Sequence, residues 1–297
     1  MKKAIRNFFN GLVFGAVQTV PSVSAGTIAI VMGFYFDLVK SINNFRKDMR
    51  GNAIFLAPVL LGACAGIVAF SAVISFLLER HALPTMLFFM GLILGVVPRV
   101  FAKAVELGGR LGAREMALAL APFPILLGLA LLRMRLGASG DPAEALAAVG
   151  AARMLFLLFA GALAAVALVV PGMSGSFVLL LLGVYPEAIY AAQSLRHFLS
   201  GSGSPELFLS ILKVLGPLGV GVIAGGLLTL RAIERLLERH GRPLYSAMAG
   251  LMAASVIALA MDPITRSGGA SLTALTIGAA AFALGFAASN RLSKGRL

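Results

Sequence analysis

The feature that most limits what this chain can fold into is a series of long apolar stretches without charged side chains. The run from Ile54 to Leu78 contains no Asp, Glu, Lys or Arg, and several other windows are almost as free of charge. About 20 such residues are enough for an α-helix to cross the hydrocarbon core of a bilayer. The composition agrees, because 59% of the residues are hydrophobic and only 12% are charged, whereas a soluble domain carries about 25% charged residues. We therefore expect an all-α polytopic membrane protein.

The chain also contains an internal duplication. When Pro21 is aligned with Pro171, residues of the same type match in order along both halves, with one change of loop length. The matched positions are Gly11 and Gly161, Gly33 and Gly183, Tyr35 and Tyr185, Asp37 and Glu187, Pro58 and Pro217, Gly62 and Gly221, and Gly91 and Gly250. The pentapeptide LLERH occurs at Leu77–His81 and again, in register, at Leu236–His240. A collinear set of this kind indicates a duplicated unit.

Each half is expected to contain a broken apolar segment followed by three ordinary spans. We expect an N-terminal repeat over residues 1–150 and a C-terminal repeat over 151–297, both within one integral membrane domain. The broken segments cover residues 5–41 and 152–192, and the spans cover about 54–78, 84–101 and 116–132, then 209–230, 244–261 and 272–288. Each broken segment is either a re-entrant pair or two full crossings, and in both cases it returns to its starting side. Three further spans then make the second repeat inverted relative to the first.

The distribution of basic residues agrees with this inverted topology. If both termini are cytoplasmic, most of the 25 Lys and Arg residues fall on the cytoplasmic side, as the positive-inside rule requires. The net charge of +13 is then explained by membrane orientation and contact with anionic head groups, and we expect no nucleic-acid partner. Inverted repeats with broken helices are typical of transporters, which bind substrate near the midplane.

The two breaks have the composition of an anion-binding site. The sequences TVPSVSAGTI and VVPGMSGSF each place proline, serine and glycine within apolar sequence. Proline suits the start of a helix, and free N–H groups, hydroxyls and the helix dipole there can bind a phosphate. The candidate phosphate ligands are Ser22, Ser24, Gly26, Thr27, Gly172, Ser174, Gly175 and Ser176. The alternative is close helix packing through small residues, as we expect for Gly11, Gly15, Gly62, Gly66, Gly91 and Gly95.

Several ionisable or aromatic residues lie near these breaks. Asp37 and Glu187 occupy matched positions, which we place about three turns along each helix. Since carboxylates near a membrane interior are unfavourable and usually functional, they are candidates for proton coupling, the alternative being a carboxylate that reaches interfacial water. Tyr35 and Tyr185 are interface anchors or phosphate contacts. Further candidates for phosphate contact are Arg99 and Arg153, although such arginines also extend to the head groups.

Nothing in the sequence indicates catalysis or a bound cofactor. No nucleophile–base arrangement or nucleotide-binding loop is apparent, and His81, His197 and His240 lack the spacing of metal ligands. The single Cys64 lies in an apolar run, where we expect a small buried residue that forms no intrachain disulfide. We therefore predict no catalytic residue, no metal and no cofactor, and the oligomeric state is left open.

The two motifs carry a resemblance to a known family. GAVQTVPSVSAGTIAIVMGFY and LVVPGMSGSFVLLLLGVYPEAI are similar to the paired signatures of the bacterial polyprenyl-phosphate translocases, over essentially the whole chain. The resemblance implies an inner-membrane protein that returns undecaprenyl phosphate from the outer to the cytoplasmic leaflet for reuse in envelope synthesis. The second motif follows the family pattern closely. The first departs from it, with Gln18 where the family usually has Asp, and Ser22 and Ala25 where it has Gly.

Three other functions are weighed against this one. A polyprenyl-pyrophosphate phosphatase also pairs broken helices with Ser/Gly motifs, but it needs an acidic or histidine cluster and an arginine beside the serines, which are absent from these motifs. A transporter of another lipid or of a small anion would use the same kind of site and differ in selectivity. A purely structural membrane protein would not need two matched anion-binding motifs.

Overall fold

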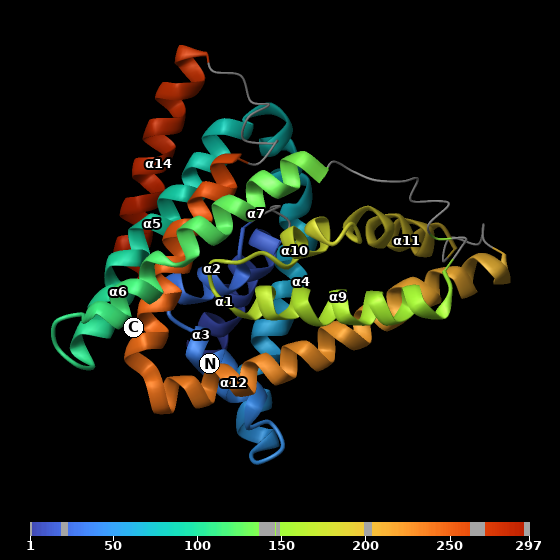
Figure 1. Cartoon of the computed structure of the whole chain (residues 1–297), viewed down its shortest axis with the longest axis horizontal. Coiled ribbons are helices and arrows are strands. Elements are labelled where there is room, and N and C mark those ends of the chain that lie inside the picture. The colour runs from blue at the N-terminus through green and yellow to red at the C-terminus, as the bar shows by residue number, and fades with distance from the viewer. Residues whose placement is uncertain are drawn as a thin grey trace. The chain divides into compact units, whose positions relative to one another are not determined.

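The protein is helical throughout the part that the computed structural model describes, residues 2–18, 23–136, 146, 149–198, 204–261 and 271–293. The main helices there, labelled in Figure 1, are α1 (Lys2–Gln18), α2 (Ala25–Val31), α3 (Tyr35–Asn43), α4 (Met49–Arg80), α5 (Ala82–Glu106), α6 (Ala113–Leu120), α7 (Pro122–Leu136), α9 (Ala151–Val169), α10 (Gly175–Leu181), α11 (Tyr185–His197), α12 (Pro205–Met261) and α14 (Leu272–Leu292).

Many of these helices suit a bilayer. Within the described ranges, six helices are long and apolar enough to cross a membrane, and the bent pairs α2–α3 and α10–α11 pass the same test of composition. Their outer faces are apolar as well, since Val68 and Leu61 on α4 are 79% and 65% exposed, and a soluble protein does not leave so large an apolar surface in water. The expected all-α polytopic membrane protein is confirmed. Cys64 is exposed on α4, so the expectation that it is buried was wrong.

The chain divides into two compact units. Unit 1 consists of Met1–Gly128, Val170–Met173 and Leu230–Leu297, and unit 2 consists of Leu129–Val169 and Ser174–Thr229. In unit 1 every residue of α2 is buried. The core of unit 2 forms around side chains that include Leu157, Ile211 and Val214, each at most 2% exposed.

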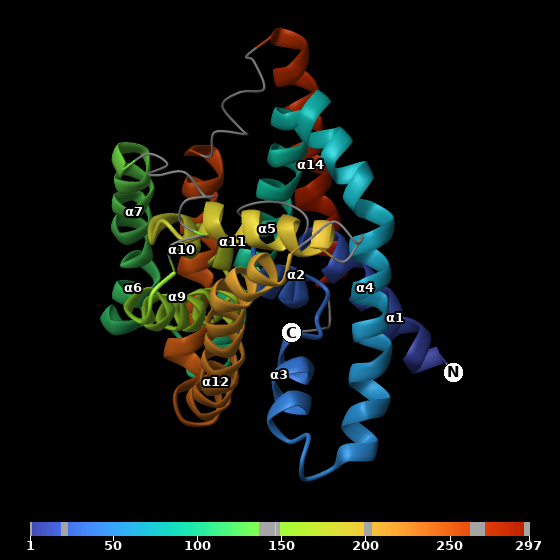
Figure 2. The same cartoon turned by 90° about the vertical axis from the view of Figure 1, so that its right-hand side faces the viewer.

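Glycines hold α1 against α4 in unit 1. A Cβ added to Gly11 would lie 2.0 Å from the carbonyl oxygen of Val59, and one added to Gly62 would lie 2.0 Å from that of Phe8. The two backbones therefore touch where a larger side chain would separate them, which is a common way for membrane helices to associate. The same two helices run side by side in Figure 2. The predicted packing role of these glycines is confirmed.

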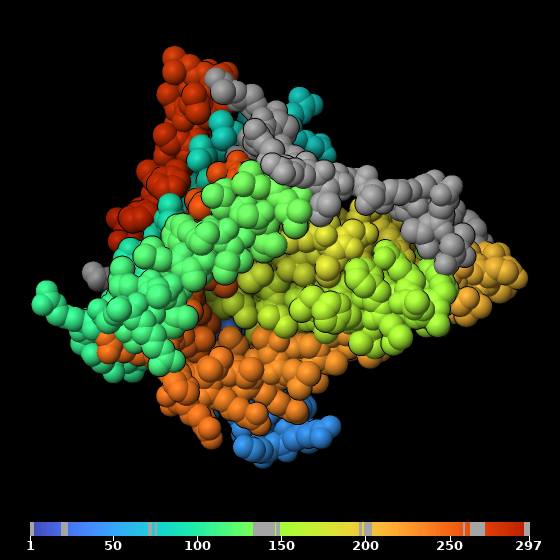
Figure 3. Space-filling model, in the orientation of Figure 1, coloured from blue at the N-terminus to red at the C-terminus, as the bar shows by residue number. Residues whose placement is uncertain are grey.

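Unit 2 repeats this packing with α9 and the first part of α12. A Cβ added to Gly161 would lie 2.2 Å from the carbonyl oxygen of Leu218, and one added to Gly221 would lie 2.0 Å from that of Leu158. All four positions match those of the α1–α4 contact in the sequence alignment of the halves. In Figure 3 the atoms of α9 lie directly beside those of α12.

The later helices of the two halves exchange partners within unit 1. Gly91 on α5 packs against Phe282 of α14, which lies at the end of the chain, because a Cβ there would be 2.1 Å from the Phe282 carbonyl oxygen. Gly250, the matched glycine on the last part of α12, packs against Ala119 of α6 in the first half, at 2.0 Å. The second half therefore supplies the helix that covers Gly91, and the first half supplies the helix that covers Gly250.

Local breaks in the backbone are duplicated too. His81 ends α4 with φ −136° and ψ 45°, and His240 interrupts α12 with φ −140° and ψ 42°. The LLERH copies thus end in the same turn. The bend between α2 and α3 is 115° and that between α10 and α11 is 113°. These matches support the duplication, while the inverted orientation of the second repeat in the membrane stays a prediction.

Candidate substrate-binding site

The first motif forms the start of the short helix α2. Ser24 is the N-cap, and its Oγ accepts a hydrogen bond from the Thr27 N–H at 3.4 Å. Ser24 and Thr27 are only 4% and 0% exposed, and Gly26 is buried as well. Pro21 and Ser22, which sequence analysis placed at this helix start, lie outside the described residues. The described hydroxyls of this motif are therefore engaged inside the protein.

The second motif contacts the first through Gly172. The Gly172 N–H donates a hydrogen bond of 2.8 Å to the Thr27 Oγ1. Gly172 has φ +93°, and a Cβ at this position would lie 2.6 Å from the backbone of Leu251 and Met252. Only glycine suits both the positive φ and the close approach. Two motifs that are far apart in sequence are thus joined by a buried hydrogen bond in unit 1.

The serines of the second motif are less enclosed. Ser174 is the N-cap of α10, but its side chain makes no capping hydrogen bond. Its Oγ lies 2.8 Å from the Oγ of Ser176, and both residues are half-buried, as is Gly175. A pair of hydroxyls has donors and lone pairs beyond the one bond that they share. Ser174 and Ser176 can therefore bind an additional polar group.

A second bend follows each of the short helices, and sequence analysis did not identify it. Gly33 and Gly183 take φ values of +71° and +67°, which favour glycine, and each turns the chain into a new helix. Asp37 and Glu187 consequently lie in the first turns of α3 and α11. The expectation that they lie about three turns along a continuous helix was wrong. This glycine recurs at matched positions in both halves, but its recurrence alone does not distinguish a bend from a continuous helix.

Glu187 forms a buried ion pair in unit 2. Its Oε2 lies 2.5 Å from the Nη2 of Arg153, and its side chain is 2% exposed. The Arg153 guanidinium also lies over the Phe156 ring, 5.1 Å from the ring centre. Arg153, a candidate for phosphate contact, is thus paired with a carboxylate, and a buried carboxylate depends strongly on such a partner.

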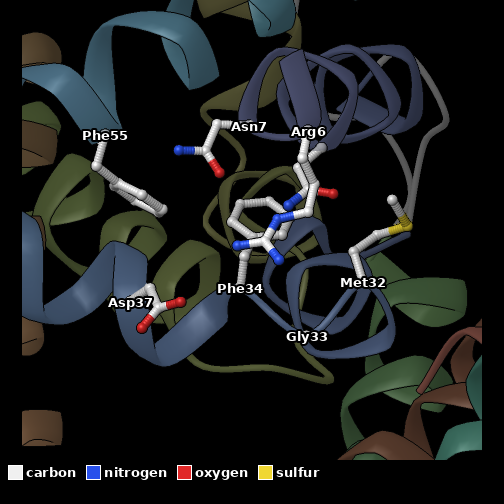
Figure 4. Close-up of a pocket in the computed structure, with 8 residues that line it drawn as sticks. Arg6, Asn7, Met32, Gly33, Phe34, Asp37 and Phe55 are labelled. Carbon is white, nitrogen blue, oxygen red and sulfur yellow. The ribbon is translucent and has the colours of Figure 1, made fainter. Parts of the chain in front are cut away.

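Asp37 has a different environment in unit 1. It is exposed and lines a cavity of about 210 Å³ with Arg6, Asn7 and Asn10 of α1 and with the turn between α2 and α3. In Figure 4 the Arg6 guanidinium and the Asp37 carboxylate both face this space, beside Phe55 of α4. Sequence analysis missed the three α1 residues, although their spacing places polar side chains on one face of an otherwise apolar helix.

The other candidates have partners or positions of their own. Arg99 donates from Nε and Nη2 to the Asn290 Oδ1 at 3.0 and 2.8 Å, at an exposed contact between α5 and α14. Tyr35 is 3% exposed and packs edge to face on Phe36, while Tyr185 is half-buried at the start of α11. Among the described residues, no group of three or more His, Cys, Asp and Glu side chains is arranged to hold a metal ion.

The fold and these contacts define a class, that of α-helical membrane proteins with two matched, interrupted helices joined at their breaks, an arrangement typical of transporters. Comparison with known proteins makes the class specific. The chain belongs to the undecaprenyl phosphate translocase-like family, whose model matches residues 14–271. The resemblance drawn from the two motifs is confirmed.

Two relatives are named as polyprenyl-phosphate transporters. The chain is 28% identical to a polyprenyl-phosphate transporter of Staphylococcus aureus over 255 residues, which is 85% of each protein. It is 30% identical to a polyprenyl-phosphate transporter of Vibrio cholerae over 207 residues, which is 65% of this chain and 61% of the relative. No solved structure matches it significantly. The family and both relatives are named for transport and not for catalysis, so this is a transporter and not an enzyme.

Proposed function

We propose that this protein carries a polyprenyl phosphate, with undecaprenyl phosphate as the expected substrate, from the outer to the cytoplasmic leaflet of the bacterial inner membrane, so that the lipid carrier is reused in envelope synthesis. The observation that carries the proposal is the similarity to the S. aureus polyprenyl-phosphate transporter over 85% of both proteins. Both termini are cytoplasmic in this proposal, and the second repeat is inverted relative to the first.

The phosphate is bound by the two Pro/Ser/Gly motifs while the prenyl tail stays in lipid. In the second motif, the half-buried hydroxyls of Ser174 and Ser176 are the principal ligands, because neither is used to cap a helix. In the first motif, Ser24 and Thr27 act mainly through the backbone that they hold in place, since their hydroxyls are engaged. The Gly172–Thr27 hydrogen bond couples the two motifs, so that a change at one break is transmitted to the other.

Inward transport of an anion requires compensation for the membrane potential. A monoanion that moves toward the negative side is opposed by about 2.3 kcal/mol per 100 mV, and a proton carried with it cancels this opposition. Asp37 and Glu187 were the matched candidates for that proton. Asp37 is the better one, because it is open to a cavity, whereas Glu187 is enclosed with Arg153.

Lipid binding and transport by purified protein test the role of the serines. We expect Ser174→Ala/Ser176→Ala to bind undecaprenyl phosphate at least about tenfold to a hundredfold more weakly than wild type, since even one lost hydrogen bond to a charged group is worth roughly 1.5–3 kcal/mol. Thr273→Ala/Thr276→Ala is the matched control, because it removes two exposed hydroxyls from α14. Equal binding by both double variants would exclude the second motif as the phosphate site. Failure of wild type to select undecaprenyl phosphate over other lipid phosphates would overturn the proposed substrate.

Proton coupling has its own test. In liposomes with an imposed pH gradient, Asp37→Asn should lose the dependence of transport on the gradient, whereas Glu187→Gln should retain it if it still folds. Unchanged gradient dependence in Asp37→Asn would remove Asp37 from the mechanism.

A further inference from the structure

The cavity beside Asp37 is lined by two asparagines from a largely apolar helix. Asn7 and Asn10 are 6% and 5% exposed, both line the cavity, and neither amide side chain forms a hydrogen bond with another described residue. Both amides line the cavity, so they can donate a hydrogen bond to an occupant or accept one from it. The cavity is therefore suited to a polar occupant.

The charges around the cavity restrict the chemistry of that occupant. Arg6 provides a guanidinium with five N–H donors, and Asp37 provides a carboxylate that only accepts hydrogen bonds while it is ionised. Both residues belong to the described part of the chain and line the same cavity, yet they form no ion pair with each other. A ligand that fits must accept bonds from Arg6, Asn7 and Asn10 and donate one to Asp37.

We propose that this cavity is a binding station for a phosphate monoester in its singly protonated form. The two unprotonated phosphate oxygens accept hydrogen bonds from Arg6 and from the two asparagine amides, and the remaining P–OH donates to the Asp37 carboxylate. A phosphate dianion has no proton for that carboxylate and is repelled by it. The inference rests on the proposed function and extends it, because it adds a second phosphate site outside the Pro/Ser/Gly motifs and specifies the charge of the head group there.

Two adjoining cavities extend the polar surface along α3. Asp37 also lines a cavity of about 260 Å³, which includes Lys40 and Glu234 of α12. Lys40 and Glu234 in turn line a third cavity of about 440 Å³, which includes Arg231 and Arg235. Because neighbouring cavities share lining residues, the proposed station lies near a region in which basic side chains outnumber carboxylates.

Two carboxylates, Glu234 and Glu238, also line that region, and Glu234 is held by hydrogen bonds from the end of α3 and the turn that follows it. Asn43 donates to one carboxylate oxygen of Glu234 at 2.8 Å, and Asn44 donates to the other at 3.0 Å. The basic side chains Lys40, Lys47, Arg231 and Arg235 outnumber these two carboxylates, so an incoming anion meets a net positive charge there. We infer that the phosphate passes between the basic region and the station along this face of α3.

The test measures the binding of farnesyl phosphate, a short prenyl monophosphate, to purified full-length protein in detergent by titration calorimetry between pH 5.5 and 8. The second pKa of a phosphate monoester is about 6. Wild-type affinity should therefore decrease as the pH rises through that value and the monoanion is lost. Arg6→Gln should weaken binding by about tenfold or more, and Asn7→Leu/Asn10→Leu should weaken it in the same direction. Arg114→Gln is the matched control, because it removes an equally exposed arginine from α6.

Asp37→Asn gives a readout that a purely structural role would not produce. The amide no longer repels the dianion, so affinity at pH 8 should increase relative to wild type and the pH profile should flatten. An unchanged pH profile in Asp37→Asn, or wild-type affinity in both Arg6→Gln and the asparagine double variant, overturns the station. Elution profile and unfolding temperature identify variants that have not folded.

The failure of this inference is distinguishable from the failure of the proposed function. If wild type binds farnesyl phosphate and only Ser174→Ala/Ser176→Ala reduces binding, the station is wrong and the proposed function stands. If wild type binds no prenyl phosphate, both are wrong. A parallel titration with inorganic phosphate shows whether the station recognises phosphate alone or requires the attached lipid.

Discussion

Gly172 is the position at which a single added methyl group should disturb the site most. Gly172→Ala keeps the N–H that donates to Thr27, but it introduces a Cβ into a residue with φ +93°. That Cβ would lie 2.6 Å from the backbone carbon of Leu251 and from the backbone nitrogen of Met252. Neither is the flexible end of a side chain, so the helix α12 itself would have to move.

The expected loss of stability has two parts. Holding a non-glycine residue at an unfavourable backbone conformation is worth about 1–3 kcal/mol, and overpacking a tight contact is worth about 1–3 kcal/mol more. Together they reduce the free energy of unfolding by about 2–6 kcal/mol, a large share of the roughly 5–15 kcal/mol of a typical domain. For a chain of this size, the unfolding temperature should fall by about 4–12 °C.

Two glycine controls separate these parts. Gly183→Ala places alanine at φ +67° with no atom within 4 Å of the new Cβ, so only the backbone part applies. Gly219→Ala lies within α12 with no neighbour within 4 Å, and it should be neutral or stabilising by up to about 1 kcal/mol. The assay is the thermal unfolding of purified protein in detergent, with lipid binding measured on the same samples.

The order of the three unfolding temperatures tests the close approach of Gly172 to α12. We expect Gly172→Ala to be the least stable, Gly183→Ala to be intermediate and Gly219→Ala to be the most stable. If Gly172→Ala unfolds at the same temperature as Gly183→Ala, the close approach of the second motif to α12 is refuted.

Three further substitutions examine contacts at or near the site. Thr27→Val keeps the shape of the side chain but removes the acceptor for the buried Gly172 N–H, so unfolding should become easier by about 1–3 kcal/mol. Arg153→Gln leaves Glu187 buried without its cation, which should destabilise by about 3–5 kcal/mol, and adding Glu187→Gln should restore most of that loss. Arg99→Gln removes an exposed hydrogen bond, so both stability, within about 0.5 kcal/mol, and lipid binding should remain unchanged.

For each of these substitutions, one specific result would contradict the expectation. Wild-type stability in Thr27→Val would mean that the two motifs are not held together by this bond. An Arg153→Gln/Glu187→Gln protein as unstable as the single variant would show that the pair acts through more than charge compensation. Loss of lipid binding in Arg99→Gln would indicate that this arginine contacts the phosphate.

The spans, the duplication and the glycine contacts could be predicted from the sequence, because they depend on local patterns. Uninterrupted apolar stretches give spans, and matched glycines give close helix contacts, as at Gly11 and Gly62. The second bend could not be predicted, because a single glycine within apolar sequence is also compatible with a continuous helix. Only the positive φ of Gly33 and Gly183 shows that α3 and α11 begin anew after it.

The different environments of Asp37 and Glu187 could not be predicted from the sequence either. The two carboxylates occupy matched positions, but their environments depend on what α1 and α9 bring near them. Alignment of the halves places Lys3 opposite Arg153. Among the described residues, Arg153 forms an ion pair of 2.5 Å with Glu187, and no matching pair joins Lys3 to Asp37. The first carboxylate instead shares a cavity with Arg6. Which side chains surround each carboxylate is determined by tertiary packing, and the alignment of the halves does not contain that information.

The exchange of helices between the halves has a consequence for biosynthesis. While the ribosome is still making the chain, the surface of α5 around Gly91 lacks its packing partner, because α14 begins only at Leu272. The first half therefore cannot complete its helix packing by itself, even though it contains a complete copy of the repeated unit. A chain interrupted before Leu272 would leave the surface of α5 around Gly91 without the helix that covers it.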